Sequence, residues 1–251
     1  MKSLFYLTTI LILTVCCEAN FSVSEATIDK EITPHFIELE TYADTSVFRN
    51  VNFLRTTNYK FLYLGKVEDT IKLNYHVNFR PPPPPLPGVE KDTMMLINDN
   101  PFENYRVDWF DERKFNYSEG SKMEVKVDTS TIVKKYDYSF ASKFIFAKAY
   151  PVIIKNQEID TIIISLNYHI PLVLEAKDSL NEWRPIERVH AYFCGIGVDR
   201  VFLPPNEIAV TSVVIYQGDY ETDLRLRLGE SLSKPFKGQI NYSQFEVEDD
   251  Y

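Results

Sequence analysis

Three stretches of the chain alternate between apolar and polar residues, and they are residues 71–79, 123–127 and 224–228. In the last of these, Leu224, Leu226 and Leu228 alternate with Arg225 and Arg227. Successive side chains of a β-strand point to opposite faces, whereas neighbours on a helix lie about 100° apart. Each stretch is therefore predicted to be a strand with one face on a core and one in water.

Weaker strand patterns occur along most of the remaining chain, at residues 35–42, 47–55, 59–64, 144–154, 161–168, 172–176, 186–193 and 208–216. Turn residues rich in Asn, Asp, Pro and Gly separate these runs, for example at 155–158, 178–181 and 203–207. No window keeps a 3.6-residue period, so helix is expected only as a turn or two near 100–105. The pattern predicts an all-β protein, with the regular strand spacing after residue 144 that is typical of a β-sandwich.

Short motifs in the second half resemble the immunoglobulin-like and fibronectin-type sandwiches. Leu203-Pro-Pro-Asn-Glu207 resembles the corner that opens one strand of these folds, and Gly218-Asp-Tyr220 resembles the entry to a later strand. Asn206 stands where Gly is usual in the corner. No Cys…Trp…Cys pattern is present, so an antibody-type domain is excluded. The resemblance covers residues 144–246, and it implies a fold without implying a function.

These observations predict an N-terminal antiparallel β domain followed by an immunoglobulin-like β-sandwich. The predicted divisions are a signal peptide (1–19), a linker (20–33), the N-terminal β domain (34–143, with a polyproline segment at 81–87), the sandwich (144–246) and an acidic tail (247–251). Five consecutive prolines adopt an extended polyproline II helix, so the 81–87 segment is expected to be a stiff exposed connection.

The first residues have the layout of a secretory signal. Lys2 supplies a positive charge, residues 4–15 are almost wholly apolar, and Cys17-Glu-Ala19 fits a small-x-small cleavage site. The apolar run is shorter than the roughly 20 residues that cross a bilayer. We therefore expect the protein to be exported to the periplasm, the outer envelope or the extracellular space.

A second processing route is compatible with the same residues. Leu13-Thr-Val-Cys16 resembles the lipidation box of bacterial lipoproteins, although Val15 is bulkier than the usual residue. Cys16 and Cys17 are thus candidates for lipidation, which would tether the protein through its N-terminus. Lipid anchoring and free secretion are both left open by the sequence.

The net charge limits the class of partner that the chain can bind, and the cysteine content limits the disulfides that it can form. The net charge of −9 argues against a nucleic-acid partner, because non-specific nucleic-acid binding needs clustered Lys and Arg. Cleavage after Ala19 would leave Cys194 alone, so no disulfide framework is expected. The expected partner is a protein or a glycan, and contact with a membrane is expected only through an N-terminal lipid.

Catalytic motifs do not stand out. The chain has no Gly-x-Ser-x-Gly, no phosphate-binding glycine loop, no His-Glu-x-x-His and no Cys-x-x-Cys. We therefore predict no catalytic residue, no cofactor and no metal site. Paired carboxylates are harder to exclude from sequence, because their separation in space is not visible there. Asp108, Asp111 and Glu112, which flank two aromatic residues, carry the hypothesis of a glycan hydrolase.

Aromatic residues are abundant, with 16 Tyr and 17 Phe. Tyr105, Trp109, Phe110 and Trp183 are candidates for stacking on a saccharide ring, with packing in a core as the alternative interpretation. The expected function is therefore an exported, non-enzymatic binding or structural protein. A carbohydrate-binding or glycan-processing accessory protein is the first alternative, and a carboxylate-dependent hydrolase is the second.

Overall fold

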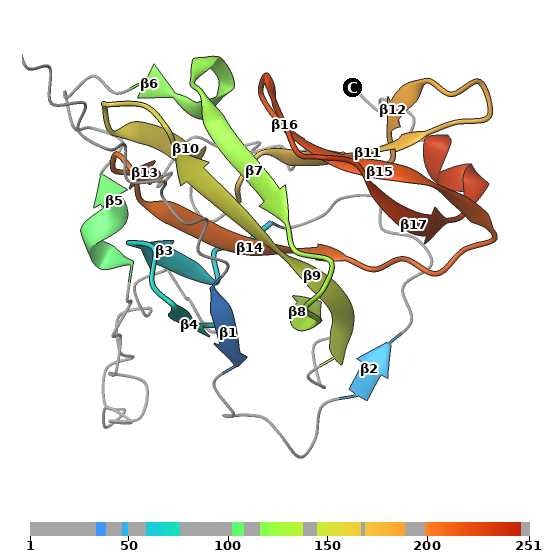
Figure 1. Ribbon diagram of the computed structural model, residues 1–251, viewed down its shortest axis with the longest axis horizontal. Helices are drawn as coiled ribbons and strands as arrows, with labels where there is room; N and C mark the ends of the chain where they lie inside the picture. Colours follow the sequence, from blue (N-terminus) through green and yellow to red (C-terminus); the bar gives the residue numbers. More distant parts are fainter. Residues whose placement is uncertain are drawn as a thin grey trace, which may run out of the picture. The chain divides into compact units, whose positions relative to one another are not determined.

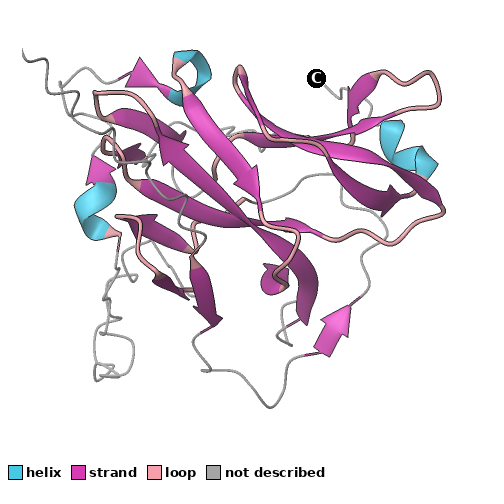
Figure 2. Cartoon of the chain, viewed as in Figure 1, coloured by secondary structure: helices cyan, strands magenta, loops and turns pink. Residues whose placement is uncertain are grey.

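The computed structural model describes residues 34–38, 47–49, 59–75, 102–107, 116–137, 145–166, 169–188 and 199–246. Strands dominate these ranges, as Figure 2 shows, and no α-helix occurs within them. Short 3-10 turns are present at η2 (Glu103–Tyr105), η3 (Ser118–Gly120) and η4 (Tyr242–Phe245). The all-β class predicted from the alternation is confirmed, and η2 lies within the 100–105 stretch where a turn or two of helix was expected.

Strand β9 (Ile145–Asn156) organises the largest sheet, in the order β2–β9–β14–β3. Its partners are β2 (Val47–Arg49), which runs parallel to it, and β14 (Ile208–Val214), which runs antiparallel and in turn pairs with β3 (Tyr63–Gly65). Strands β7 (Met123–Val127) and β8 (Val133–Asp137) also pair with β9, along its C-terminal and N-terminal halves respectively (Figure 1).

Every residue of β14 is buried. Ile208 and Val210 join one core cluster, whereas Ala209 and Val213 on the opposite face join another. A strand covered on both faces is expected to be an apolar run rather than an alternation, which explains the sequence Ile208-Ala-Val-Thr-Ser-Val-Val214.

A second sheet has the order β12–β11–β15–β16, and β17 pairs with another part of β15. Its strands are β11 (Leu172–Lys177), β12 (Trp183–Pro185), β15 (Tyr220–Leu228), β16 (Ser231–Leu232) and β17 (Phe236–Ile240). All of these pairs are antiparallel. This sheet carries the candidate functional site described below.

Two smaller sheets complete the described strands. The first has the order β5–β13–β10–β6, with β5 (Arg106–Val107), β13 (Arg200–Leu203), β10 (Ile162–Leu166) and β6 (Asn116–Tyr117). The second is the parallel pair of β1 (His35–Glu38) and β4 (Thr70–Leu73).

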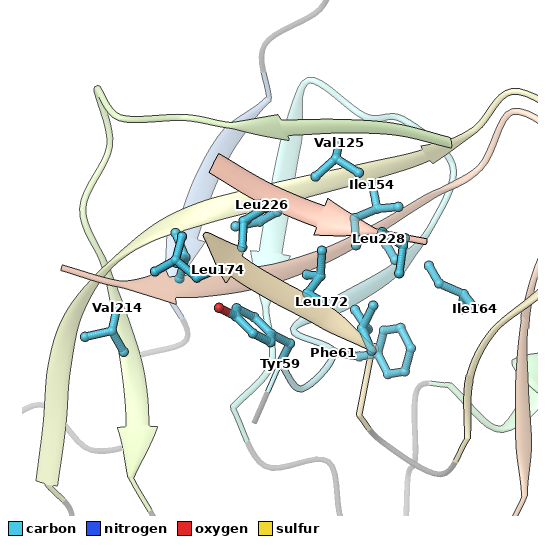
Figure 3. Close-up of a cluster of buried hydrophobic side chains, with 14 of the residues drawn as sticks. Tyr59, Phe61, Val125, Ile154, Ile164, Leu172, Leu174, Val214, Leu226 and Leu228 are labelled. Carbon is cyan, nitrogen blue, oxygen red and sulfur yellow. The ribbon is translucent and has the colours of Figure 1, made fainter. Parts of the chain in front are cut away.

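The larger core cluster draws side chains from three sheets. Val125 and Ile154 belong to the β9 sheet, Leu174 and Leu226 to the β15 sheet, and Ile164 to the β10 sheet. Figure 3 shows these side chains together with Tyr59 and Phe61. A smaller cluster packs Phe36, Ile71 and Leu73 of the β1–β4 pair on the other face of β14.

The alternation at 123–127 and 224–228 corresponds to β7 and β15, whereas the predicted strand 71–79 ends at Leu73 in β4 and the described residues Asn74 and Tyr75 lie outside it. Leu224, Leu226 and Leu228 are buried while the residues between them are partly exposed, and Met123 and Val125 behave in the same way. Two weaker strand predictions were inaccurate in the described residues. Of 59–64, only the end is a strand, in β3, and residues 186–188 belong to no named strand because the pairing with β11 already ends at β12.

Strands from both sides of residue 144 share sheets and cores. Strands β3, β7 and β8 precede that residue and pair with β9 or β14, which follow it. Whether 34–143 and 144–246 fold independently stays a prediction, as does the finer sandwich topology. The signal region, the polyproline segment and the acidic tail lie outside the described residues.

Candidate functional site

The strand register places a set of charged side chains on one face of the β15 sheet. Glu175 of β11 lies opposite Arg225 of β15, and Val173 lies opposite Arg227. The residues that alternate with them, such as Leu174 and Leu226, face the core. Because side chains alternate along a strand, Glu175, Arg225 and Arg227 project from the opposite face, here called the outer face.

Glu175 holds two arginines at once. Its Oε2 accepts a hydrogen bond from Arg225 Nε at 2.7 Å, and its Oε1 accepts one from Arg227 Nε at 2.6 Å. The side chain of Glu175 is only 8% exposed, whereas those of Arg225 and Arg227 are 21% and 40% exposed. A carboxylate with so little solvent needs charged partners, so the two arginines stabilise it and it fixes their orientation.

Trp183 contributes an aromatic ring to the same group. The register of β12 places it opposite Lys177, and its ring centroid lies 4.2 Å from Arg225 Cζ and 5.4 Å from Lys177 Nζ. Both cations are within the range of a cation–π contact. The guanidinium of Arg225 is therefore positioned by two contacts. Its Nε donates to Glu175, and its Cζ lies over the ring of Trp183.

A row of paired charges crosses the sheet beside these arginines. Asp223 lies 3.8 Å from Lys177 Nζ and 2.7 Å from Lys237 Nζ. The hydrogen bond from Lys237 is the largest influence on Asp223 and lowers its pKa below the usual value; desolvation opposes this shift, and the charges of Lys237 and Lys177 add to it. The same hydrogen bond raises the pKa of Lys237. These groups are solvated, so they add charge to the face but little stability.

The outer face is locally positive on a negative chain. Its cations are Lys177, Arg225, Arg227 and Lys237, and its anions are Glu175, Glu221 and Asp223, so the local sum is +4 − 3 = +1, whereas the whole chain carries −9. Such a contrast favours the approach of an anionic group to this face.

Tyr105 lies in a different sheet environment. It is in η2, its hydroxyl donates to Glu207 Oε2 at 2.7 Å, and its ring lies 5.9 Å from that of Phe202 in β13. Burial, together with the hydrogen bond to Glu207 and its charge, raises the pKa of Tyr105 well above its usual value. Tyr105 and Trp183 therefore belong to separate groups of side chains.

The remaining sequence-predicted site residues lie outside the described residues. These are Trp109, Phe110 and the lipidation candidates Cys16 and Cys17, together with Asp108, Asp111 and Glu112 of the hydrolase hypothesis. Among the described residues, no group of three or more His, Cys, Asp or Glu side chains could hold a metal ion. Within the same ranges, no helix is long and apolar enough to cross a membrane.

A second polar group, which sequence reasoning missed, lies in the core. Glu187 is 2% exposed and accepts 2.5 Å hydrogen bonds from the hydroxyls of Tyr59 and Tyr216. Lys135 Nζ lies 4.4 Å from the centroid of the Tyr59 ring and donates to the backbone oxygen of Ser212. Tyr59 is 128 residues from Glu187, so no local pattern could have revealed the group.

No protein-family model, no curated protein and no solved structure matches the chain. Its function must therefore be argued from its own residues.

Proposed function

We propose that this chain is an exported, non-enzymatic protein of the cell envelope or extracellular space with a binding role, and that its ligand contacts the outer face of the β15 sheet. The observation that carries the proposal is the pair of arginines fixed by Glu175 and Trp183. Side chains already fixed in one conformation lose little entropy when a ligand arrives, which is an advantage in a binding surface.

The core group supports a binding role over a catalytic one. Both carboxylate oxygens of Glu187 accept from tyrosines inside the core, so this buried acid is engaged in holding segments together. The outer face, in contrast, directs its charges toward solvent, and Lys237 is 72% exposed. Glycan binding, the first alternative from the sequence, is compatible with this face and is developed in the next subsection.

Two measurements test the proposal. Intact mass of the protein from its native host is expected to show a chain starting at Asn20, or at Cys16 or Cys17 with added acyl mass. Purified protein is expected to be retained by the envelope fraction of that host and released by salt, because the binding face is charged. An intracellular protein with an intact N-terminus, or no retention by envelope or secreted material, would contradict it.

A further inference from the structure

The two arginines of the outer face have unused donors. Each contacts Glu175 through Nε, and in the described part of the chain nothing accepts from the Nη groups of Arg225 or Arg227. A guanidinium has five N–H donors in a rigid plane, and its terminal groups suit the two oxygens of a planar oxyanion. The contacts with Glu175 thus leave the Nη donors of both arginines available, and the two residues lie two positions apart on one strand.

Apolar side chains border these donors. Pro185 lies opposite Glu175 and is exposed, and Leu232 lies opposite Arg227 and is 47% exposed. Together with Trp183, they flank the guanidinium pair with surfaces that the apolar faces of a sugar ring can cover. A partner that carries both carboxylates and rings matches this combination.

We infer that the outer face binds the carboxylate groups of an acidic polysaccharide, with Arg225 and Arg227 as the primary contacts and Lys177 at the rim. This inference rests on the proposed binding function and names its ligand class. The polymer lies along the face so that its carboxylates accept from the Nη groups and its rings cover Pro185 and Leu232.

The charge distribution favours a narrow chain over a broad anionic surface. The face carries a local sum of +1, while the whole molecule carries −9. A membrane or a nucleic-acid duplex is an extended array of negative charge, so its approach to a molecule of net charge −9 is opposed by repulsion. A single polysaccharide chain can contact the arginine pair alone.

The test measures binding of polygalacturonate by titration calorimetry at two salt concentrations, with the full-length protein. Wild type is expected to bind polygalacturonate and not the neutral polymer dextran. Arg227→Gln is expected to weaken binding at least tenfold, about 1.4 kcal/mol, because the variant loses hydrogen bonds between charged groups. Arg227→Lys keeps the positive charge but lacks the planar guanidinium with its paired donors. This variant is expected to lose most of the wild-type affinity for polygalacturonate.

Lys237→Gln is the matched control. It removes the same unit of charge from the same face, at a side chain that is 72% exposed, and is expected to weaken binding less than threefold. Thermal unfolding of each variant separates loss of binding from loss of fold. Arg227 is partly exposed, and Arg225 still pairs with Glu175 in the variant, so Arg227→Gln is expected to remain folded.

Three outcomes would overturn the inference. The first is an equal loss of affinity for polygalacturonate in Arg227→Gln and Lys237→Gln. The others are binding of dextran as tight as that of polygalacturonate, and binding of phosphatidylglycerol vesicles or duplex DNA tighter than that of polygalacturonate. No binding of polygalacturonate, with retention by the native envelope fraction intact, would refute the ligand class and leave the binding function standing. If the protein neither binds polygalacturonate nor is retained by the envelope fraction, both the ligand class and the binding function are refuted.

Discussion

At the scale of single residues, Glu187 shows how a buried charge is accommodated. Its partners come from the segment before β3 and the segment after β14, so one carboxylate joins regions far apart in the sequence. Burial, followed by the charge of Glu187, raises the pKa of Tyr216 well above its usual value. Because a buried charge that loses a donor keeps its full desolvation cost, each phenol matters to stability.

Tyr216→Phe is expected to lower the free energy of unfolding by about 1–3 kcal/mol, since it leaves Glu187 Oε1 without its donor. Urea denaturation at pH 7 measures the change. Tyr117→Phe, at a ring that is 48% exposed, serves as the control and should shift the free energy of unfolding by less than about 0.5 kcal/mol. Equal effects of the two substitutions would show that the contact with Glu187 contributes nothing.

Alkaline pH should also destabilise the protein through Tyr216. A phenol whose pKa is higher in the folded state than in the unfolded one favours folding below about pH 10, and this contribution is lost as pH rises further. Lys60, whose pKa burial lowers to about 8, acts in the opposite direction between about pH 8 and 10.5. Urea midpoints between pH 8 and 11 should fall less in Tyr216→Phe than in wild type above pH 10, and since Lys60 is common to both, its effect cancels. Parallel curves would disprove the contribution of Tyr216.

Asn206 illustrates a single-residue feature that the sequence did indicate. It occupies the glycine position of the strand-opening corner and has a φ of 61°, in the left-handed region that Asn tolerates better than most residues. Its backbone N–H donates to Asn156, and the backbone N–H of Asn156 donates back to Glu207. The departure from Gly therefore preserves the backbone conformation that the corner requires.

At the scale of elements, close backbone packing explains the glycine before β15. A Cβ atom at Gly218 would overlap the backbone of Ile240 and Asn241, whereas one at Gly238 would overlap only the side chain of Leu224. Backbone paired in a sheet cannot move aside as a side chain can. The glycine that resembled a family motif thus has a local physical reason in this chain.

Gly218→Ala is accordingly expected to cost about 1–3 kcal/mol, because β17 must shift away from β15. Gly238→Ala should cost about 1 kcal/mol or less, since Leu224 can adjust its rotamer and alanine is favoured over glycine within a strand. Thermal denaturation of the two variants compares them directly. A larger loss at Gly238 would show that the core around Leu224 is less adaptable than the β15–β17 backbone contact.

Several strands were not predicted, and their sequences explain why. In β8, Lys135 is buried in place of an apolar residue, and β17 contains Gly238 in its centre. Neither shows an alternation that predicts a strand. Their extended conformation follows from pairing with β9 and β15, which supply the hydrogen bonds and the packing.

At the scale of the whole molecule, one core cluster contains residues from both sides of the predicted boundary at residue 144. Tyr59, Phe61 and Leu64 lie in the same cluster as Leu174 and Leu226. Met123 donates its backbone N–H to the Ser231 hydroxyl, which connects β7 to the β15 sheet. These contacts bear on whether the second half can fold without the first.

We expect the fragment 144–246, expressed alone, not to unfold cooperatively. It lacks Tyr59, Phe61, Leu64, Met123 and Val125, whose burial contributes about 1.5–3 kcal/mol each. The sum, about 8–15 kcal/mol, equals the whole stability of a typical domain. Denaturant titration monitored by far-UV circular dichroism gives the answer, with the full chain as the control. A cooperative transition in the fragment would instead support an independent C-terminal domain.

The sequence by itself determined the all-β class and the inward faces of β4, β7 and β15, because alternation is a local property that needs no knowledge of partners. It also identified Trp183 as a residue of interest, although as a ring for stacking. Only the tertiary structure decided that Trp183 holds Arg225, that Glu175 gathers two arginines, and that Glu187 meets two tyrosines. Those contacts depend on strand register and on pairs separated by 29 to 128 residues, which the local pattern of a chain cannot specify.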